Sequence, residues 1–115
     1  MKTADSTFDS IVLGGGTAGA AAALFLARRG LRVLLLDKRP RERVGATWVN
    51  GLERRLFTEL GLGTPPDGVV FHQDGRFITA SFDGTARQMV EHSPAYEVDM
   101  RALNAWLLDL AEQAG

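Results

Sequence analysis

Residues 8–40, which read FDSIVLGGGTAGAAAALFLARRGLRVLLLDKRP, decide the fold. The apolar run 11–13 ends at three glycines, which indicates a short strand followed by a tight turn. Residues 17–29 contain no Pro and no Gly after Gly19, so we expect a helix there that Gly30 ends. A second apolar run, 31–36, stops at Asp37. This order predicts a βαβ unit over residues 8–37, with two parallel strands that are buried on both faces.

The turn between the predicted strand and helix matches the pattern G-x-G-x-x-G. Its residues are Gly14, Gly15, Gly16, Thr17, Ala18 and Gly19. The pattern alone is weak, but inside a βαβ unit with an acidic residue ending the second strand it is typical of dinucleotide-binding turns. We expect Gly14 to permit the tight turn and Gly16 to let the backbone approach a pyrophosphate. Gly19 should let the helix pack closely on the sheet.

Asp37 ends the second predicted strand, where a carboxylate accepts hydrogen bonds from the ribose hydroxyls of a dinucleotide. The same carboxylate would repel a ribose 2′-phosphate, which disfavours NADP. Lys38 follows in the same predicted cofactor-binding set, and with Arg39 it adds positive charge that weakens this exclusion. FAD and NAD both carry free ribose hydroxyls, so the motif by itself does not choose between them.

The rest of the chain predicts one inserted β region between two helices. We expect a loop over 38–50, a helix over about 52–60 and a turn-rich link over 63–68. Asp-Gly pairs at 74–75 and 83–84 predict a small antiparallel meander over about 69–90. Residues 91–98 read as irregular, and a last helix over about 99–114 should begin at Asp99. Its predicted buried stripe is Leu103, Leu107, Leu110 and Ala114.

The composition is that of an ordinary globular domain. The 115 residues include 13 Lys and Arg against 14 Asp and Glu, which excludes a wholly disordered chain and argues against a general nucleic-acid binder. The chain has no Cys, and its two histidines give no ligand pattern, so we expect neither disulfides nor a metal site. The longest apolar stretch, 18–27, is too short for a membrane span. We expect a cytoplasmic protein.

Basic residues are concentrated between residues 28 and 55. That segment holds nine of the 13 Lys and Arg residues and only three acidic ones. A solvated surface is the simplest interpretation. A positive rim around a phosphate or an anionic substrate is the sharper one.

Three segments together resemble FAD-dependent oxidoreductases of the glutathione-reductase-like superfamily. Residues 8–40 are similar to the opening of the aromatic-hydroxylase, geranylgeranyl-reductase and halogenase group, although Asp37 stands where that group usually has Glu. GLERRLFTELGL, residues 51–62, resembles the helix after the FAD loop. YEVDMRALNAWLLDLAEQAG, residues 96–115, is similar to the R-x-x-L helix, in which Arg101 matches the arginine that reaches the FAD phosphates.

This resemblance implies an FAD-dependent oxidoreductase of monooxygenase or reductase type, with a Rossmann-like α/β fold. It implies a small-molecule substrate and NAD(P)H as a candidate reductant. The family continues with a further strand, a substrate domain and a late Gly-Asp motif, so the chain resembles the N-terminal part of a longer flavoenzyme, incomplete at its C-terminus. No catalytic residue can be named. An NAD-dependent dehydrogenase and a non-catalytic dinucleotide-binding fragment stay open as alternatives.

Overall fold

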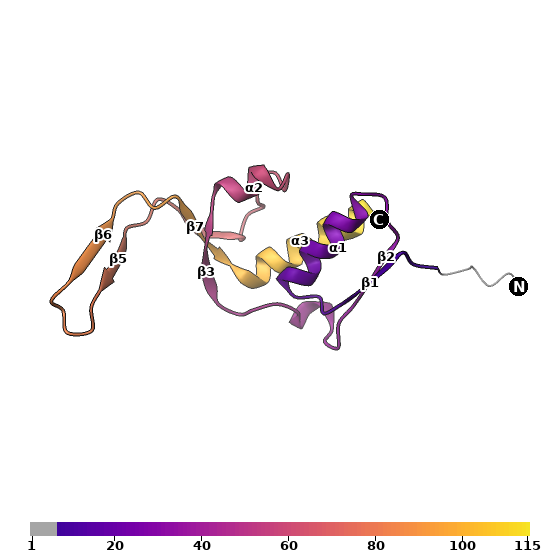
Figure 1. Cartoon of the computed structure of the whole chain (residues 1–115), viewed down its shortest axis with the longest axis horizontal. Helices are drawn as coiled ribbons and strands as arrows, with labels where there is room; N and C mark the ends of the chain where they lie inside the picture. The colour runs from indigo at the N-terminus through magenta and orange to yellow at the C-terminus, as the bar shows by residue number, and fades with distance from the viewer. Residues whose placement is uncertain (1–6) are drawn as a thin grey trace, which may run out of the picture. The chain divides into compact units, whose positions relative to one another are not determined.

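The computed structural model describes residues 7–115 and divides them into two compact units. The first unit combines the described residues up to Thr47 with Met100–Gly115. The second unit is Trp48–Asp99. Figure 1 traces the chain through both units from the indigo N-terminal end to the yellow C-terminal end.

The first unit begins with the predicted βαβ arrangement. Strand β1 is Ser10–Leu13, helix α1 is Thr17–Ala27 and strand β2 is Val33–Leu36. The two strands pair in parallel along all four residues of each, which confirms the prediction from the sequence. Gly30 has φ of +81° and donates its N–H to the Ala27 carbonyl at 2.8 Å, so it follows the helix end as expected.

The expectation that both strands are buried on two faces is wrong. The side chains of Ile11 and Leu13 are 59% and 79% exposed, and Leu36 is 46% exposed. Successive side chains of a strand point to opposite faces, and α1 packs against only one face of this pair. Within the described residues, nothing buries the other face.

Helix α3, Met100–Ala114, lies beside α1 and forms the core of the first unit with it (Figure 1). The buried residues of α1 are Ala20, Ala23, Leu24 and Ala27, and those of α3 are Leu103, Asn104, Leu107 and Leu108. The predicted stripe of α3 was therefore partly wrong, since Leu110 is half-buried and Ala114 is exposed. The buried side chains of α1 are mostly alanines, and they leave room for the larger buried side chains of α3. This packing determines which residues of α3 face α1.

The segment after β2 differs from the predicted loop and helix. A short 3-10 helix, η1, occupies Arg41–Arg43, and strand β3 occupies Val49–Glu53. Helix α2 is only Arg55–Glu59, so the prediction of a helix starting near residue 52 is wrong. The reason is tertiary, because β3 pairs antiparallel with strand β7, Ala95–Asp99, along its whole length.

The second unit is built on a three-stranded antiparallel sheet in the order β3-β7-β4, with β4 at Val70–His72. Phe57 of α2 is buried, and its ring lies 5.8 Å from that of Tyr96 in β7. The central strand β7 falls in the segment predicted to be irregular, so that prediction is also wrong.

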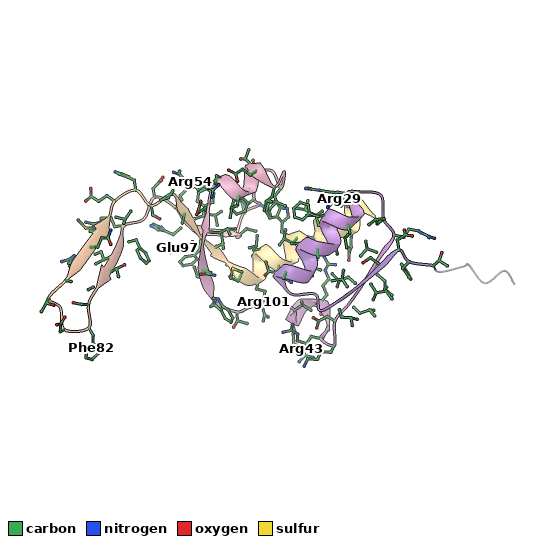
Figure 2. All side chains as sticks on the ribbon, in the orientation of Figure 1. Arg29, Arg43, Arg54, Phe82, Glu97 and Arg101 are labelled. Carbon is green, nitrogen blue, oxygen red and sulfur yellow. The ribbon has the colours of Figure 1, made fainter. Side chains whose placement is uncertain are left out.

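The predicted meander is replaced by two separate sets of strands. Strand β4 pairs with β7 rather than with β5, Phe77–Ala80. Strand β5 instead forms a hairpin with β6, Arg87–Val90, around the Asp83-Gly84 turn that the sequence predicts. Figure 2 shows Phe82 at the tip of this hairpin. No helix in the described part of the chain is long and apolar enough to cross a membrane.

Candidate cofactor-binding site

The glycine turn leaves β1 through a conformation that requires glycine. Gly14 has φ of +100°, and its N–H donates to the Leu36 carbonyl at 2.7 Å. A Cβ on Gly19 would lie only 1.8 Å from the Gly14 carbonyl oxygen. The first turn of α1 therefore lies directly against the turn that precedes it, which only a glycine at position 19 allows.

The N-terminus of α1 opens onto empty space. The first helical hydrogen bond runs from the Ala20 N–H to the Gly16 carbonyl at 2.8 Å, so the N–H groups of Thr17, Ala18 and Gly19 precede the intrahelical ladder. No side chain among the described residues caps this end, and its first turn carries no acid. A Cβ on Gly16 would meet no atom within 4 Å. The helix end can accept an anion with backbone donors already in place.

Asp37 lies beside this turn and accepts hydrogen bonds from two residues, Gly15 and Arg39. Its Oδ2 accepts the Gly15 N–H at 2.8 Å, and its Oδ1 accepts the Arg39 N–H at 2.8 Å and Nε at 3.2 Å. The Arg39 side chain, the Arg39 N–H and the Gly15 N–H hold the pKa of the Asp37 carboxyl well below its ordinary value. Asp37 is therefore an ionised acceptor at neutral pH.

A hollow of about 560 Å³ lies at the carboxyl ends of the two parallel strands. Its lining is Leu13, Gly14, Leu36, Asp37, Lys38 and Arg39. Ligands of open α/β sheets bind outside these strand ends. The structure thus brings Gly14, Asp37 and Lys38 of the predicted set to one opening. A second hollow of about 490 Å³ lies between α1, β2 and α3. Aliphatic side chains form about half of its lining, and Gly15, Asp37, Arg39 and Arg41 also line it, so it adjoins the same site.

Arg101 lies in the first turn of α3 and reaches toward the loop after β2. Its Nη1 donates to the Glu42 carbonyl at 3.3 Å. Figure 2 shows the side chains of Arg101 and of Arg43, which belongs to the same loop as Glu42. A contact between Arg101 and the cofactor phosphates stays a prediction.

Asn104 is a residue of this site that the sequence reasoning missed. It is fully buried, and its Nδ2 donates to the Gly15 carbonyl at 3.0 Å across 89 positions of sequence. Gly45, which has φ of +101°, lies so close that a Cβ there would be 3.0 Å from the Asn104 Cβ. The sequence did offer one indication of this residue, because Asn104 is an amide side chain within the predicted apolar stripe of the last helix.

Ion pairs neutralise much of the basic segment. Arg32 pairs with Asp9, Arg39 with Asp37, Arg41 with Asp109 and Glu112, Arg54 with Asp74, and Arg55 with Glu53 and Glu59. Apart from the Asp37 side chain, which is only 10% exposed, the partners are exposed, and exposed pairs contribute little to stability. They favour the interpretation of this segment as a solvated surface.

The chain matches known flavoproteins over almost its whole length. The family profile described as FAD dependent oxidoreductase matches residues 9–115. The probable electron transfer flavoprotein-quinone oxidoreductase YdiS of Escherichia coli strain K12 is 30% identical over 122 residues, which cover 96% of this chain and 28% of that protein.

Solved structures show the same fold. A geranylgeranyl bacteriochlorophyll reductase-like protein from Thermoplasma acidophilum is similar with a TM-score of 0.78 and 22% identity, over 94% of this chain and 28% of that one. The myxobacterial chondrochloren halogenase CndH, described as a variant of FAD-dependent halogenases, has a TM-score of 0.63 and 25% identity, over 94% and 27%. This chain spans less than a third of the length of these proteins.

Proposed function

Because this chain belongs to the family of FAD-dependent oxidoreductases, we propose that its glycine turn and Asp37 hold the adenosine diphosphate half of FAD. FAD supplies the redox chemistry when bound, and the residues of this chain bind and orient it. The observation that carries the proposal is the hydrogen bond of 2.8 Å from the Gly15 N–H to Asp37 Oδ2. This hydrogen bond joins the turn that would face the phosphates to the carboxylate that would face the ribose.

The pyrophosphate would lie over the N-terminus of α1. The free N–H groups there and the positive end of the helix dipole both favour an anion. The open space beside Gly16 suits a close approach of the phosphates to the backbone. The site lacks a competing acidic side chain in the first helical turn of the described chain.

The adenosine ribose would lie in the hollow at the strand ends, with its hydroxyls donating to the Asp37 carboxylate. In this structure the Arg39 guanidinium already donates a hydrogen bond to that carboxylate, from Nε to Oδ1 at 3.2 Å. The Arg39 side chain is 45% exposed, so its guanidinium can move into solvent when the ribose hydroxyls replace it as donors to the carboxylate. The hydrogen bond from the backbone N–H of Gly15 goes to the other carboxylate oxygen, Oδ2, and stays in place.

For the whole protein we propose an oxidoreductase of the reductase or monooxygenase type that acts on a small organic molecule. Similarity to a reductase-like protein and to a halogenase of the FAD-dependent class supports this proposal. The residues that contact the substrate are expected in the part of the relatives that this chain does not span.

The proposal is tested by FAD affinity in Gly16→Val. The new side chain would fill the open space at the helix end, so FAD should bind at least about tenfold more weakly, the loss expected when hydrogen bonds to a charged group are broken. Isothermal titration with FAD measures this. Gly51→Val in β3 is the matched control, because a Cβ there also meets no atom within 4 Å. Wild-type FAD affinity in Gly16→Val would show that the turn does not hold the cofactor.

A further inference from the structure

Asn104 is a polar residue that is buried with one of its polar atoms unpaired, which costs folding free energy. Its side chain is fully inaccessible, yet its Oδ1 has no hydrogen-bond partner among the described residues. An unpaired buried acceptor destabilises a fold, and an aliphatic side chain of the same shape would avoid it. The one polar contact that Asn104 does make, from Nδ2 to the Gly15 carbonyl, is therefore the feature to explain.

The two polar groups of Gly15 are both held by side chains from distant segments. Its N–H donates to Asp37 at 2.8 Å, and its carbonyl accepts from Asn104 at 3.0 Å. Gly15 itself is buried. Asp37 follows β2 and Asn104 lies on α3, so the turn is clamped from two independent elements.

The hydrogen bond from Asn104 to the Gly15 carbonyl determines the direction of the Gly16 N–H. A trans peptide is planar, and its C=O and N–H point in opposite directions. None of the peptide bonds described is cis. Because the Gly15 carbonyl points inward to Asn104, the Gly16 N–H points outward. A Cβ on Gly16 would also meet no atom within 4 Å, so there is open space at this residue.

The Asn104 side chain is itself held in place by a second contact, with Gly45. Gly45 lies close against Asn104, where a Cβ would be 3.2 Å from its Cγ. Val44 beside it is buried and lies near Gly15, 3.3 Å from the position of a Cβ there. The Asn104 side chain is thus held between the glycine turn and the loop that carries Gly45.

We propose that Asn104 is a positioning residue that aims the Gly16 N–H at the pyrophosphate of the cofactor. This inference rests on the proposed function. It separates the two halves of the ligand site, because Asn104 governs the donor to phosphate, whereas Asp37 faces the ribose. The two residues should therefore respond differently to ligands with and without phosphates.

The test compares ADP with adenosine in Asn104→Leu, a variant of similar shape without a donor. ADP and FAD should bind about tenfold more weakly, whereas adenosine affinity, followed by NMR titration, should stay within about twofold of wild type, since about 1.4 kcal/mol corresponds to tenfold. Asp37→Ala should weaken both ADP and adenosine. The melting temperature of Asn104→Leu should stay close to that of wild type, because the variant removes one unpaired acceptor, Oδ1, and creates another at Gly15.

Three results overturn the proposal. Wild-type ADP affinity in Asn104→Leu would show that the amide does not aim the donor. An equal loss for ADP and adenosine would make Asn104 a merely structural residue. If Asn104→Leu does not fold, Asn104→Ala must show the same selective loss of ADP, or the proposal fails. A wild-type protein that binds neither FAD nor ADP would refute the proposed function itself, a result distinct from the first two.

Discussion

Gly16 and Gly19 belong to one motif but meet different physical demands. The space beside Gly16 is empty, whereas the space beside Gly19 is filled by the Gly14 carbonyl at 1.8 Å from a Cβ position. A glycine at position 19 is therefore needed by the fold. A glycine at position 16 is needed only if something from outside the chain comes close to the backbone.

This difference predicts opposite behaviour of two alanine variants. Gly19→Ala should lower the free energy of unfolding by about 3 kcal/mol or more, at the upper end of the cost of overpacking, because backbone has to move. Gly16→Ala has no clash and should cost about 1 kcal/mol or less, as expected for exchanging glycine for alanine at an N-cap. Urea unfolding of the two variants measures both values. Similar stability of the two would contradict the close approach of α1 to the turn.

At the scale of elements, the packing of α1 on α3 depends on which alanines face inward. Four consecutive alanines, residues 20–23, give no local indication of this, yet Ala23 is buried and Ala22 is exposed. The helix α3 presents Leu107 and Leu108 to this small-residue face of α1. Close packing leaves little room for larger side chains there.

The alanine run therefore offers a matched pair of substitutions. Ala20→Leu should destabilise the protein by about 1–3 kcal/mol, because Ala20 is fully buried and three extra heavy atoms cannot fit beside it without displacing their neighbours. Ala22→Leu, the same change at an exposed position two residues later, should alter stability by no more than about 0.5 kcal/mol. Alanine and leucine have similar helix propensity, so the comparison isolates packing. Equal effects on the melting temperature would mean that α3 does not pack on this face.

At the scale of the whole molecule, each unit exposes apolar side chains. In the first unit these include Ile11 and Leu13 on the uncovered face of β1. In the second unit the hairpin of β5 and β6 exposes Phe77, Phe82 and Met89. Exposed apolar strands with unpaired edges favour association with other chains. The relatives are more than three times as long, and we propose that further segments cover these faces in the whole flavoenzyme.

The 115-residue chain produced alone should therefore associate and bind FAD weakly. Sedimentation velocity over a range of concentrations should show oligomers, and the double variant Ile11→Thr/Leu13→Thr should shift them toward monomer, because threonine suits strands but presents less apolar surface. A matched double variant, Arg29→Thr/Gln113→Thr, changes two exposed positions, one in the turn after α1 and one on α3, and should leave the oligomers unchanged. A monomeric wild-type chain at all concentrations would contradict the need for a covering segment.

The sequence by itself determined the βαβ start, the parallel pairing and the family. These depend on features read within a short span, namely an apolar run, a glycine pattern and an acidic residue at the end of the next strand. The hairpin of β5 and β6 could also be predicted from a short span, because the Asp83-Gly84 pair marks its turn. Such features can be predicted because each is imposed by backbone geometry or by neighbours close in the chain.

Only the tertiary structure decided which strands pair beyond the first unit and what supports the glycine turn. Strand β3 was read as part of a loop and a helix, since its residues suit several conformations and pairing with β7, more than 40 positions later, selects one. The support of Gly15 by Asn104 spans 89 positions. Contacts of this kind leave no local pattern, because their free energy depends on which distant residue packing brings within reach.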